Sequence, residues 1–110
     1  MIDLYSAATP NGYKVSCTLE EVGLPYTLHA VDLSKGEQKE PWFLAMNPNG
    51  RVPVIEDDGF VLWESNTIVR YLCARAGRGC PTDLRQRANA ERWMDWQQNT
   101  LNRASGPAFV

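Results

Sequence analysis

Two periods of apolar residues organise the first half of the chain. Residues 2–5 alternate between apolar and polar, which is typical of a short strand, and apolar residues 15, 19 and 22 then recur at helical spacing before Gly23. Alternation returns over residues 26–33, and residues 41–46 begin with a proline and predict a short helical turn. The expected order is therefore strand, helix, strand and helical turn.

A hairpin and another helix are expected next. Residues 52–56 and 60–63 have the composition of strands, and the Asp-Gly pair within residues 57–59 favours a tight turn between them. A helix is expected to open at residues 64–66 and to end at the glycines that follow residue 76. Together these elements predict an α/β domain in the order βαβ-α-ββα, with a four-stranded mixed sheet covered by helices.

One more helix has no sheet to pack on. The residues before Leu84 predict its start, and apolar residues continue to position 101, before Gly106. We therefore expect residues 1–80 to form one domain and residues 81–110 to begin an all-helical second domain that is truncated in this chain. Four bulky side chains of this helix need burial: Trp93, Met94, Trp96 and Leu101.

Composition narrows the range of functions. The net charge of −2 gives no basic footprint for nucleic acid, and no apolar run reaches the roughly 18 residues of a membrane span. His29 is the only histidine, so neither a zinc cluster nor a histidine-based catalytic triad is supported. The three cysteines form no CxxC pair and no signal sequence opens the chain, so reduced thiols and a cytoplasmic location are expected.

Three short segments could carry chemistry. Pro53 stands at the mouth of a strand, where a proline donates no ladder hydrogen bond and could aim a backbone at a ligand. Ser65 lies at a helix start, where exposed N–H groups attract an anion, although it could simply be an N-cap. Thr9 and Asn11 stand at another helix start and have the same two interpretations.

In this order and spacing, the segments resemble the N-terminal, thioredoxin-like domain of the soluble glutathione transferases. The resemblance covers about residues 1–80, with motifs at residues 9–12, 47–55 and 63–72, and residues 82–110 are similar to the first helix of that family's helical second domain. The Thr9-Pro10-Asn11 pattern is closest to the bacterial and fungal nu-class and to its relatives of the yeast nitrogen-regulator type.

The resemblance implies a role for each motif in binding glutathione. The bond between Val52 and Pro53 would be cis, and the Val52 backbone would pair with the cysteinyl part of the tripeptide. Ser65 would hold the γ-glutamyl carboxylate and Glu64 the ammonium group. Gln38 would contact the glycyl end, for which three basic residues are equally suited: Lys35, Lys39 and Arg51.

Thr9 and Asn11 would donate hydrogen bonds to the sulfur at a helix N-terminus and so favour the thiolate. Tyr5 is an alternative activator that strand alternation could equally bury. Cys17 is expected to pack within its helix rather than to act as a covalent nucleophile.

Two functions follow from the resemblance. The first is an enzyme, either a glutathione-dependent transferase or a disulfide-bond reductase, which acts on a small electrophile or a disulfide. The second is a glutathione-binding regulatory protein without turnover. The resemblance also implies a homodimer, to which Arg70 and Arg75 could contribute.

Overall fold

The computed structural model describes residues 1–77 and 83–96, and the chain divides into two compact units, Met1–Gly79 and Cys80–Val110. The first unit contains a four-stranded sheet in the order β2-β1-β3-β4. Strand β1 is parallel to β2 and antiparallel to β3, and β3 is antiparallel to β4. The strands are β1 (Ile2–Ser6), β2 (Tyr26–Ala30), β3 (Val54–Asp57) and β4 (Phe60–Trp63).

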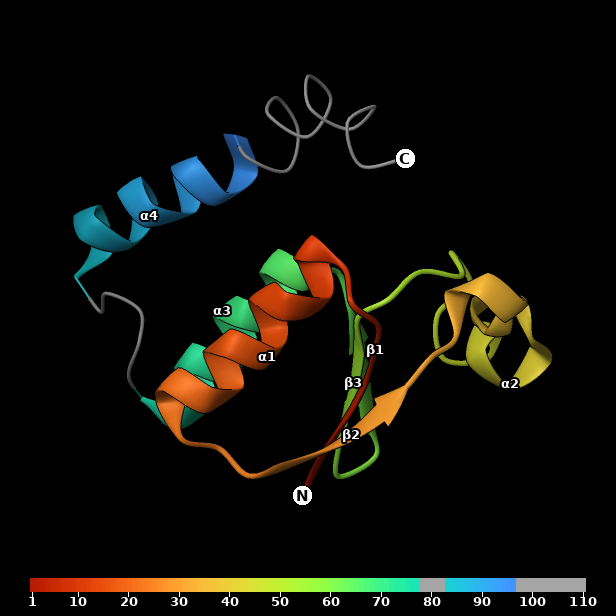
Figure 1. Cartoon of the computed structure of the whole chain (residues 1–110). Helices are drawn as coiled ribbons and strands as arrows, with labels where there is room; N and C mark the ends of the chain where they lie inside the picture. The colour runs from red at the N-terminus through yellow and green to blue at the C-terminus, as the bar shows by residue number, and fades with distance from the viewer. Residues whose placement is uncertain (78–82, 97–110) are drawn as a thin grey trace. The chain divides into compact units, whose positions relative to one another are not determined.

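Helices cover both faces of this sheet. Figure 1 shows α1 (Pro10–Val22) and α3 (Ser65–Ala76) on one face and α2 (Pro41–Leu44) on the other. Two 3-10 turns, η1 (Leu33–Lys35) and η2 (Glu37–Lys39), precede α2. The predicted fold class, a mixed four-stranded sheet in a thioredoxin-like arrangement, is confirmed.

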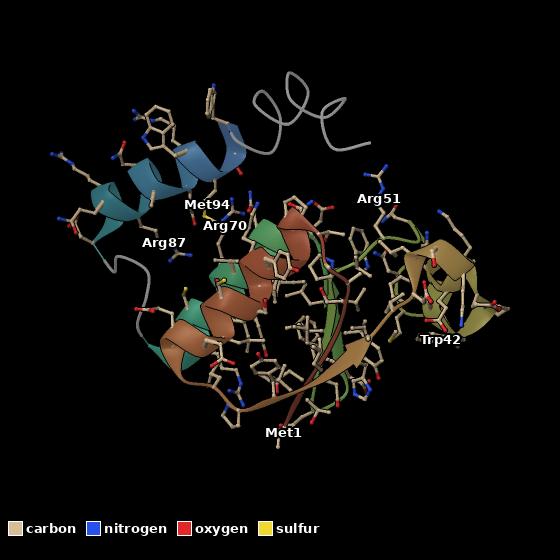
Figure 2. The ribbon with its side chains drawn as sticks, in the orientation of Figure 1. Met1, Trp42, Arg51, Arg70, Arg87 and Met94 are labelled. Atoms are coloured by element: carbon tan, nitrogen blue, oxygen red, sulfur yellow. The ribbon has the colours of Figure 1, made fainter. Side chains whose placement is uncertain are left out.

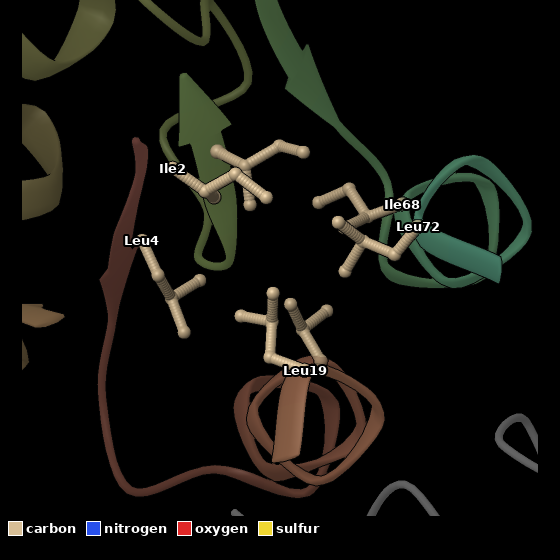
Figure 3. Close-up of a cluster of buried hydrophobic side chains, with 7 residues drawn as sticks. Ile2, Leu4, Leu19, Ile68 and Leu72 are labelled. Atoms are coloured by element: carbon tan, nitrogen blue, oxygen red, sulfur yellow. The ribbon is translucent and has the colours of Figure 1, made fainter. Parts of the chain in front are cut away.

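Two clusters of apolar side chains hold the layers together. The larger one lies between the sheet and the helix pair α1 and α3, and Figure 3 shows its side chains converging from the sheet and both helices. The smaller cluster lies on the opposite face and contains Val31, Phe43 and Val54. The labelled members in Figure 3 are Ile2, Leu4, Leu19, Ile68 and Leu72.

Two predicted strands are shorter than expected. Strand β2 ends at Ala30 rather than near residue 33, because the Asp32 side chain accepts hydrogen bonds from the Ser34 and Lys35 amides and starts η1 instead. Strand β3 begins at Val54 rather than at residue 52, since Pro53 has no N–H to give to the ladder. The turn between β3 and β4 uses Asp58 and Gly59, both with positive φ, as the Asp-Gly signal predicted.

The second unit is described through α4 (Leu84–Trp96). The Asp83 side chain accepts a hydrogen bond from the Gln86 amide at 3.0 Å and caps this helix. Trp93 and Trp96 are exposed and meet edge to face, with ring centroids 5.6 Å apart. The expected continuation to Leu101 and the residues 78–82, Cys80 included, lie outside the described residues. Among the helices of residues 1–77 and 83–96, none is long and apolar enough to span a membrane.

Candidate functional site

The predicted site residues converge because of the strand directions. Strands β1, β2 and β4 all point the same way, so their carboxyl ends share one end of the sheet, which we name the carboxyl end. Strand β3 runs the opposite way and therefore begins there. Figure 2 shows Arg51, just before β3, at this end and Met1 at the other. The N-termini of α1 and α3 and the loop of residues 47–53 thus meet at one place.

At the N-terminus of α1, Thr9 is the N-cap. Its Oγ1 accepts a hydrogen bond from the Gly12 amide at 3.0 Å, and Pro10 occupies the first helical position. The capping interpretation of Thr9 is therefore correct. A capping hydroxyl uses a lone pair and keeps its own proton for donation, so capping and thiol activation are compatible.

Asn11 offers a donor beside that hydroxyl. It is half-buried on the first turn of α1, and within residues 1–77 and 83–96 its side-chain amide has no hydrogen-bond partner. An amide NH₂ next to a positive helix end is a suitable donor to an anionic sulfur. The first turn of α1 contains no acidic side chain that would oppose this effect.

Gly12 explains why the β1–α1 loop sits so close to the first turn of α1. A Cβ atom added at this position would lie 2.4 Å from Ser6 Oγ and 2.5 Å from the Ala7 carbonyl oxygen. It would also lie 3.1 Å from Thr9 Oγ1. Only a residue without a side chain allows this approach, so Gly12 permits the close packing of the β1–α1 loop on the first turn of α1.

The loop before β3 is shaped by Asn47, a residue that we did not predict as part of the site. Asn47 is buried; its Nδ2 donates to the Arg51 carbonyl at 2.9 Å, and its Oδ1 accepts from the Asn49 amide at 3.0 Å. Asparagine side chains commonly close turns in this way, so its place at the head of Asn-Pro-Asn-Gly was a usable signal.

This loop presents the backbone of Val52. The Val52–Pro53 bond is cis, as the resemblance implied. Within the described part of the chain, neither the N–H nor the C=O of Val52 has a hydrogen-bond partner. The pair is therefore available to an extended peptide that would continue the strand pairing.

The N-terminus of α3 differs from that of α1. The N-cap is Glu64, whose side chain makes no capping hydrogen bond, and Ser65 is already the first helical residue. The suggestion that Ser65 is the N-cap is therefore wrong. Its Oγ is buried and has no hydrogen-bond partner within residues 1–77 and 83–96.

Glu64 itself has an unusual backbone. Its φ of 79° and ψ of 108° lie outside the regions that residues other than glycine normally occupy. Such conformations are concentrated at binding sites, where the surrounding structure maintains them. The result is a helix start without a side-chain cap, where a hydroxyl without a partner among the described residues lies beside an exposed carboxylate, which suits a zwitterionic ligand.

Gln38 lies on η2 and is half-buried. Its Oε1 is buried without a hydrogen-bond partner among the residues that the structure describes. The Gln38 carbonyl approaches the loop before β3 closely, because a Cβ atom on Gly50 would meet it at 3.0 Å. All three basic alternatives, Lys35, Lys39 and Arg51, are exposed. Lys35 Nζ lies 4.0 Å from Asp32 Oδ2.

Tyr5 packs on the α2 face of the sheet rather than beside α1. Its ring stacks on His29 at a centroid distance of 4.6 Å and lies 6.2 Å from the Trp42 ring. Burial raises the pKa of the Tyr5 phenol, and the nearby Asp3 and Glu56 charges raise it further. These contacts assign Tyr5 a packing role, which is the outcome that strand alternation allowed.

The cysteines correct one expectation. Cys17 is exposed, so the prediction that it packs within the fold is wrong, whereas Cys73 is buried. The buried face of α1 carries Val15, Leu19 and Val22. At 100° per residue, position 17 points about 200° away from position 15, toward solvent.

Within residues 1–77 and 83–96, no cluster of three or more His, Cys, Asp or Glu side chains could hold a metal ion.

The arrangement can be compared with known proteins. Residues 1–74 match the family described as "Glutathione S-transferase, N-terminal domain". The chain is 44% identical over 108 residues to the disulfide-bond oxidoreductase YfcG of Escherichia coli K12, covering 92% of this chain and 50% of the relative. It is 37% identical over 99 residues to Protein URE2 of Eremothecium gossypii, covering 82% of this chain and 28% of the relative.

A solved structure agrees with these matches. The glutathione transferase from Pseudomonas putida, crystallised with one glutathione disulfide per subunit, superposes with a TM-score of 0.92 at 34% identity. The alignment covers 96% of this chain and 48% of that protein. The chain spans about half the length of the first curated relatives that it matches. The expected resemblance, URE2-like proteins included, is confirmed, and the chain belongs to the glutathione S-transferase family, whose N-terminal domain it contains in residues 1–74.

Proposed function

We propose that the protein binds glutathione at the carboxyl end of the sheet and activates its thiol at the N-terminus of α1. The observation that carries this proposal is the Ser65 hydroxyl, which is buried, unpartnered among the described residues and located at a helix start without a side-chain cap. An orphan buried hydroxyl costs stability unless a ligand satisfies it. A carboxylate at this position would accept hydrogen bonds from the hydroxyl and from the helix amides.

The other contacts follow from the shape of the tripeptide. With its γ-glutamyl carboxylate on Ser65 and its ammonium on Glu64, glutathione would extend along the Val52 backbone, which lacks a partner within the described residues. Its glycyl end would then reach Gln38, and its cysteinyl side chain would face Thr9 and Asn11. Each of these groups has a donor or acceptor to spare.

The chemistry is that of a stabilised thiolate. The helix end and the donors of Thr9 and Asn11 favour loss of the thiol proton, which passes to water. In the reductase reaction the sulfur forms a bond to one sulfur of a disulfide, and the other leaves with the bonding electrons and takes up a proton. The thiolate of a second glutathione would then attack the glutathione sulfur of this mixed disulfide, so that glutathione disulfide forms and the remaining half of the substrate leaves with the bonding electrons and takes up a proton. In the transferase reaction the same thiolate displaces a leaving group from a small electrophile.

The comparisons support both reactions, since a relative from Escherichia coli K12 that is 48% identical is named a glutathione S-transferase. One relative is named a disulfide-bond oxidoreductase, and one solved neighbour holds glutathione disulfide. The alternative function, a glutathione-binding regulatory protein without turnover, would use the same glutathione-binding residues. A cytoplasmic location and a homodimer stay predictions from the sequence.

Calorimetry with glutathione tests the proposed binding site. We expect Ser65→Ala to weaken binding about 10- to 100-fold, since a hydrogen bond to a charged group contributes roughly 1.5–3 kcal/mol. Thr67→Ala is the matched control, because Thr67 is exposed on the same turn of α3. Equal affinities of Ser65→Ala and the parent protein would remove Ser65 from the site, and absence of binding by the parent protein would refute the whole proposal.

Turnover separates the two functions. We expect the protein to reduce bis(2-hydroxyethyl) disulfide with glutathione as the electron donor. Binding of glutathione without reduction of this disulfide and without conjugation of a chloronitrobenzene would support the regulatory function instead.

A further inference from the structure

One hydrogen bond joins the two helix N-termini that form the candidate site. Lys14 Nζ donates to Asn66 Oδ1 at 3.0 Å, across 52 positions of sequence. Lys14 is on the second turn of α1, and Asn66 is on the first turn of α3. Nothing in the hydrophobic pattern required a polar contact at this point.

The bond places a cation in partly buried surroundings. Asn66 is only 7% exposed, and Lys14 is half-buried. Burial lowers the pKa of Lys14, which shows that its environment disfavours the charge. The Asn66 amide oxygen, as the acceptor of this hydrogen bond, offsets part of that cost.

Cohesion of the two helices does not depend on this bond either. Val15 and Leu19 on α1 already pack against Ile68 and Leu72 on α3 within the main core, and all four are fully buried. Those contacts fix the helix pair along its length, and the polar bond acts only near the ends that face the candidate site.

The two bonded residues are close neighbours of the groups proposed to bind glutathione. Asn66 directly follows Ser65, so a hydrogen bond to the Asn66 side chain holds the first turn of α3, which carries the Ser65 hydroxyl. Lys14 lies three positions after Asn11, which puts both on the same side of α1, about 4.5 Å apart along its axis. The bond thereby links the thiol donors to the carboxylate site.

We propose that Lys14 is a positioning residue: through Asn66 it fixes the spacing between the N-termini of α1 and α3, so that one glutathione molecule reaches both. This inference rests on the proposed function. It adds a residue that affects glutathione affinity without contacting either end of the ligand. The effect on affinity is expected only for ligands that span the two helix ends.

The test compares Lys14→Met, Asn66→Ala and the double variant with the parent protein. We expect each single variant to weaken glutathione binding about tenfold, and the double variant to be no weaker than either single one, because both remove the same bond. The bound thiol should also lose acidity, measured as a shift of the thiolate absorbance to higher pH. Lys14→Arg keeps a cationic donor and should recover most of the affinity.

Arg85→Met is the matched control, since it removes an exposed positive charge on α4. Independent, additive effects of Lys14→Met and Asn66→Ala would overturn the proposal, as would affinities within twofold of the parent protein or a failure of Lys14→Arg to rescue. If Lys14→Met does not fold, Asn66→Ala and Lys14→Arg give the same decision. Absence of glutathione binding by the parent protein would instead refute the proposed function itself.

Discussion

The N-termini of α1 and α3 face the same end of one sheet but are built in opposite ways. At α1, Thr9 has extended backbone angles and caps the Gly12 amide. At α3, Glu64 has a positive φ and no capping bond, and the Ser65 hydroxyl next to it is buried without a partner among the described residues. The first terminus caps one of its amides with its own side chain, whereas the second has no side-chain cap.

This difference predicts that the two helix termini contribute differently to the stability of the fold and to the binding of glutathione. At α1, Thr9 should contribute to folding as well as to thiol chemistry, because its capping hydrogen bond already exists in the unliganded protein. Side chains at α3 should contribute mainly when glutathione is present. Substitutions at the two termini can therefore confirm or refute the contrast.

The largest effect is expected from Gly12→Ala. The added methyl group would overlap Ser6 Oγ and the Ala7 carbonyl oxygen, and a backbone oxygen cannot move aside cheaply. We expect the free energy of unfolding to fall by about 3 kcal/mol, at the upper end for overpacked sites. Urea denaturation measures this loss. Gly36→Ala is the control for replacing a glycine, because a Cβ atom at Gly36 would meet nothing within 4 Å. Its φ of 73° means that this control includes backbone strain but no steric overlap. A smaller loss for Gly12→Ala than for Gly36→Ala would contradict the tight approach.

Asn11→Ala tests whether α1 serves the thiol. We expect the pKa of bound glutathione's thiol to rise by about one unit, equivalent to about 1.4 kcal/mol, while the dissociation constant changes less than threefold. Titration of the thiolate absorbance in the complex measures the shift. An unchanged titration curve would remove Asn11 from the mechanism and leave the helix end and Thr9 as the activating groups.

Thr9→Ala and Ser65→Ala test the contrast directly. Loss of the Thr9 cap should cost about 1 kcal/mol of unfolding free energy. Loss of the Ser65 hydroxyl should cost nothing or stabilise slightly, because it removes a buried group without a partner in the described part of the chain. Chemical denaturation without glutathione gives both values, and equal losses would show that the two termini are not different in kind.

The smallest effect is expected from Glu64→Gly. Glycine tolerates the positive φ of this position, which relieves about 1 kcal/mol of strain, but it also increases the entropy of the unfolded chain by about 0.4–1 kcal/mol. The net change in stability should be a stabilisation of a few tenths of a kcal/mol. Glutathione affinity should nevertheless fall, since the carboxylate opposite the ammonium is gone. A clear loss of stability would show that Glu64 holds α3 in place in the unliganded protein.

Much of the fold could be predicted from local rules. Gly23 and Gly77 end helices with left-handed backbone, and Asp58-Gly59 forms the hairpin turn, as their residue types required. The burial of Val15 and Leu19 followed from helical spacing. The same spacing also placed Cys17 on the exposed side, so that error came from neglecting a pattern that was present in the sequence.

Details of the site could not be obtained in this way. Local preference allowed Ser65 to be an N-cap, and only the packed structure shows that Glu64 takes that place and leaves the Ser65 hydroxyl buried and unpartnered among the described residues. The burial of Gln38 Oε1 depends on how η2 packs in the fold. The bond from Lys14 to Asn66 joins residues that are 52 positions apart.

By itself, the sequence determined the order of the elements, the turns and the motifs that identify the family, because these depend on interactions between near neighbours along the chain. The tertiary structure decided which polar atoms are satisfied and which remain for a ligand. That outcome depends on burial and on partners that the fold brings from distant segments, and no local pattern specifies them.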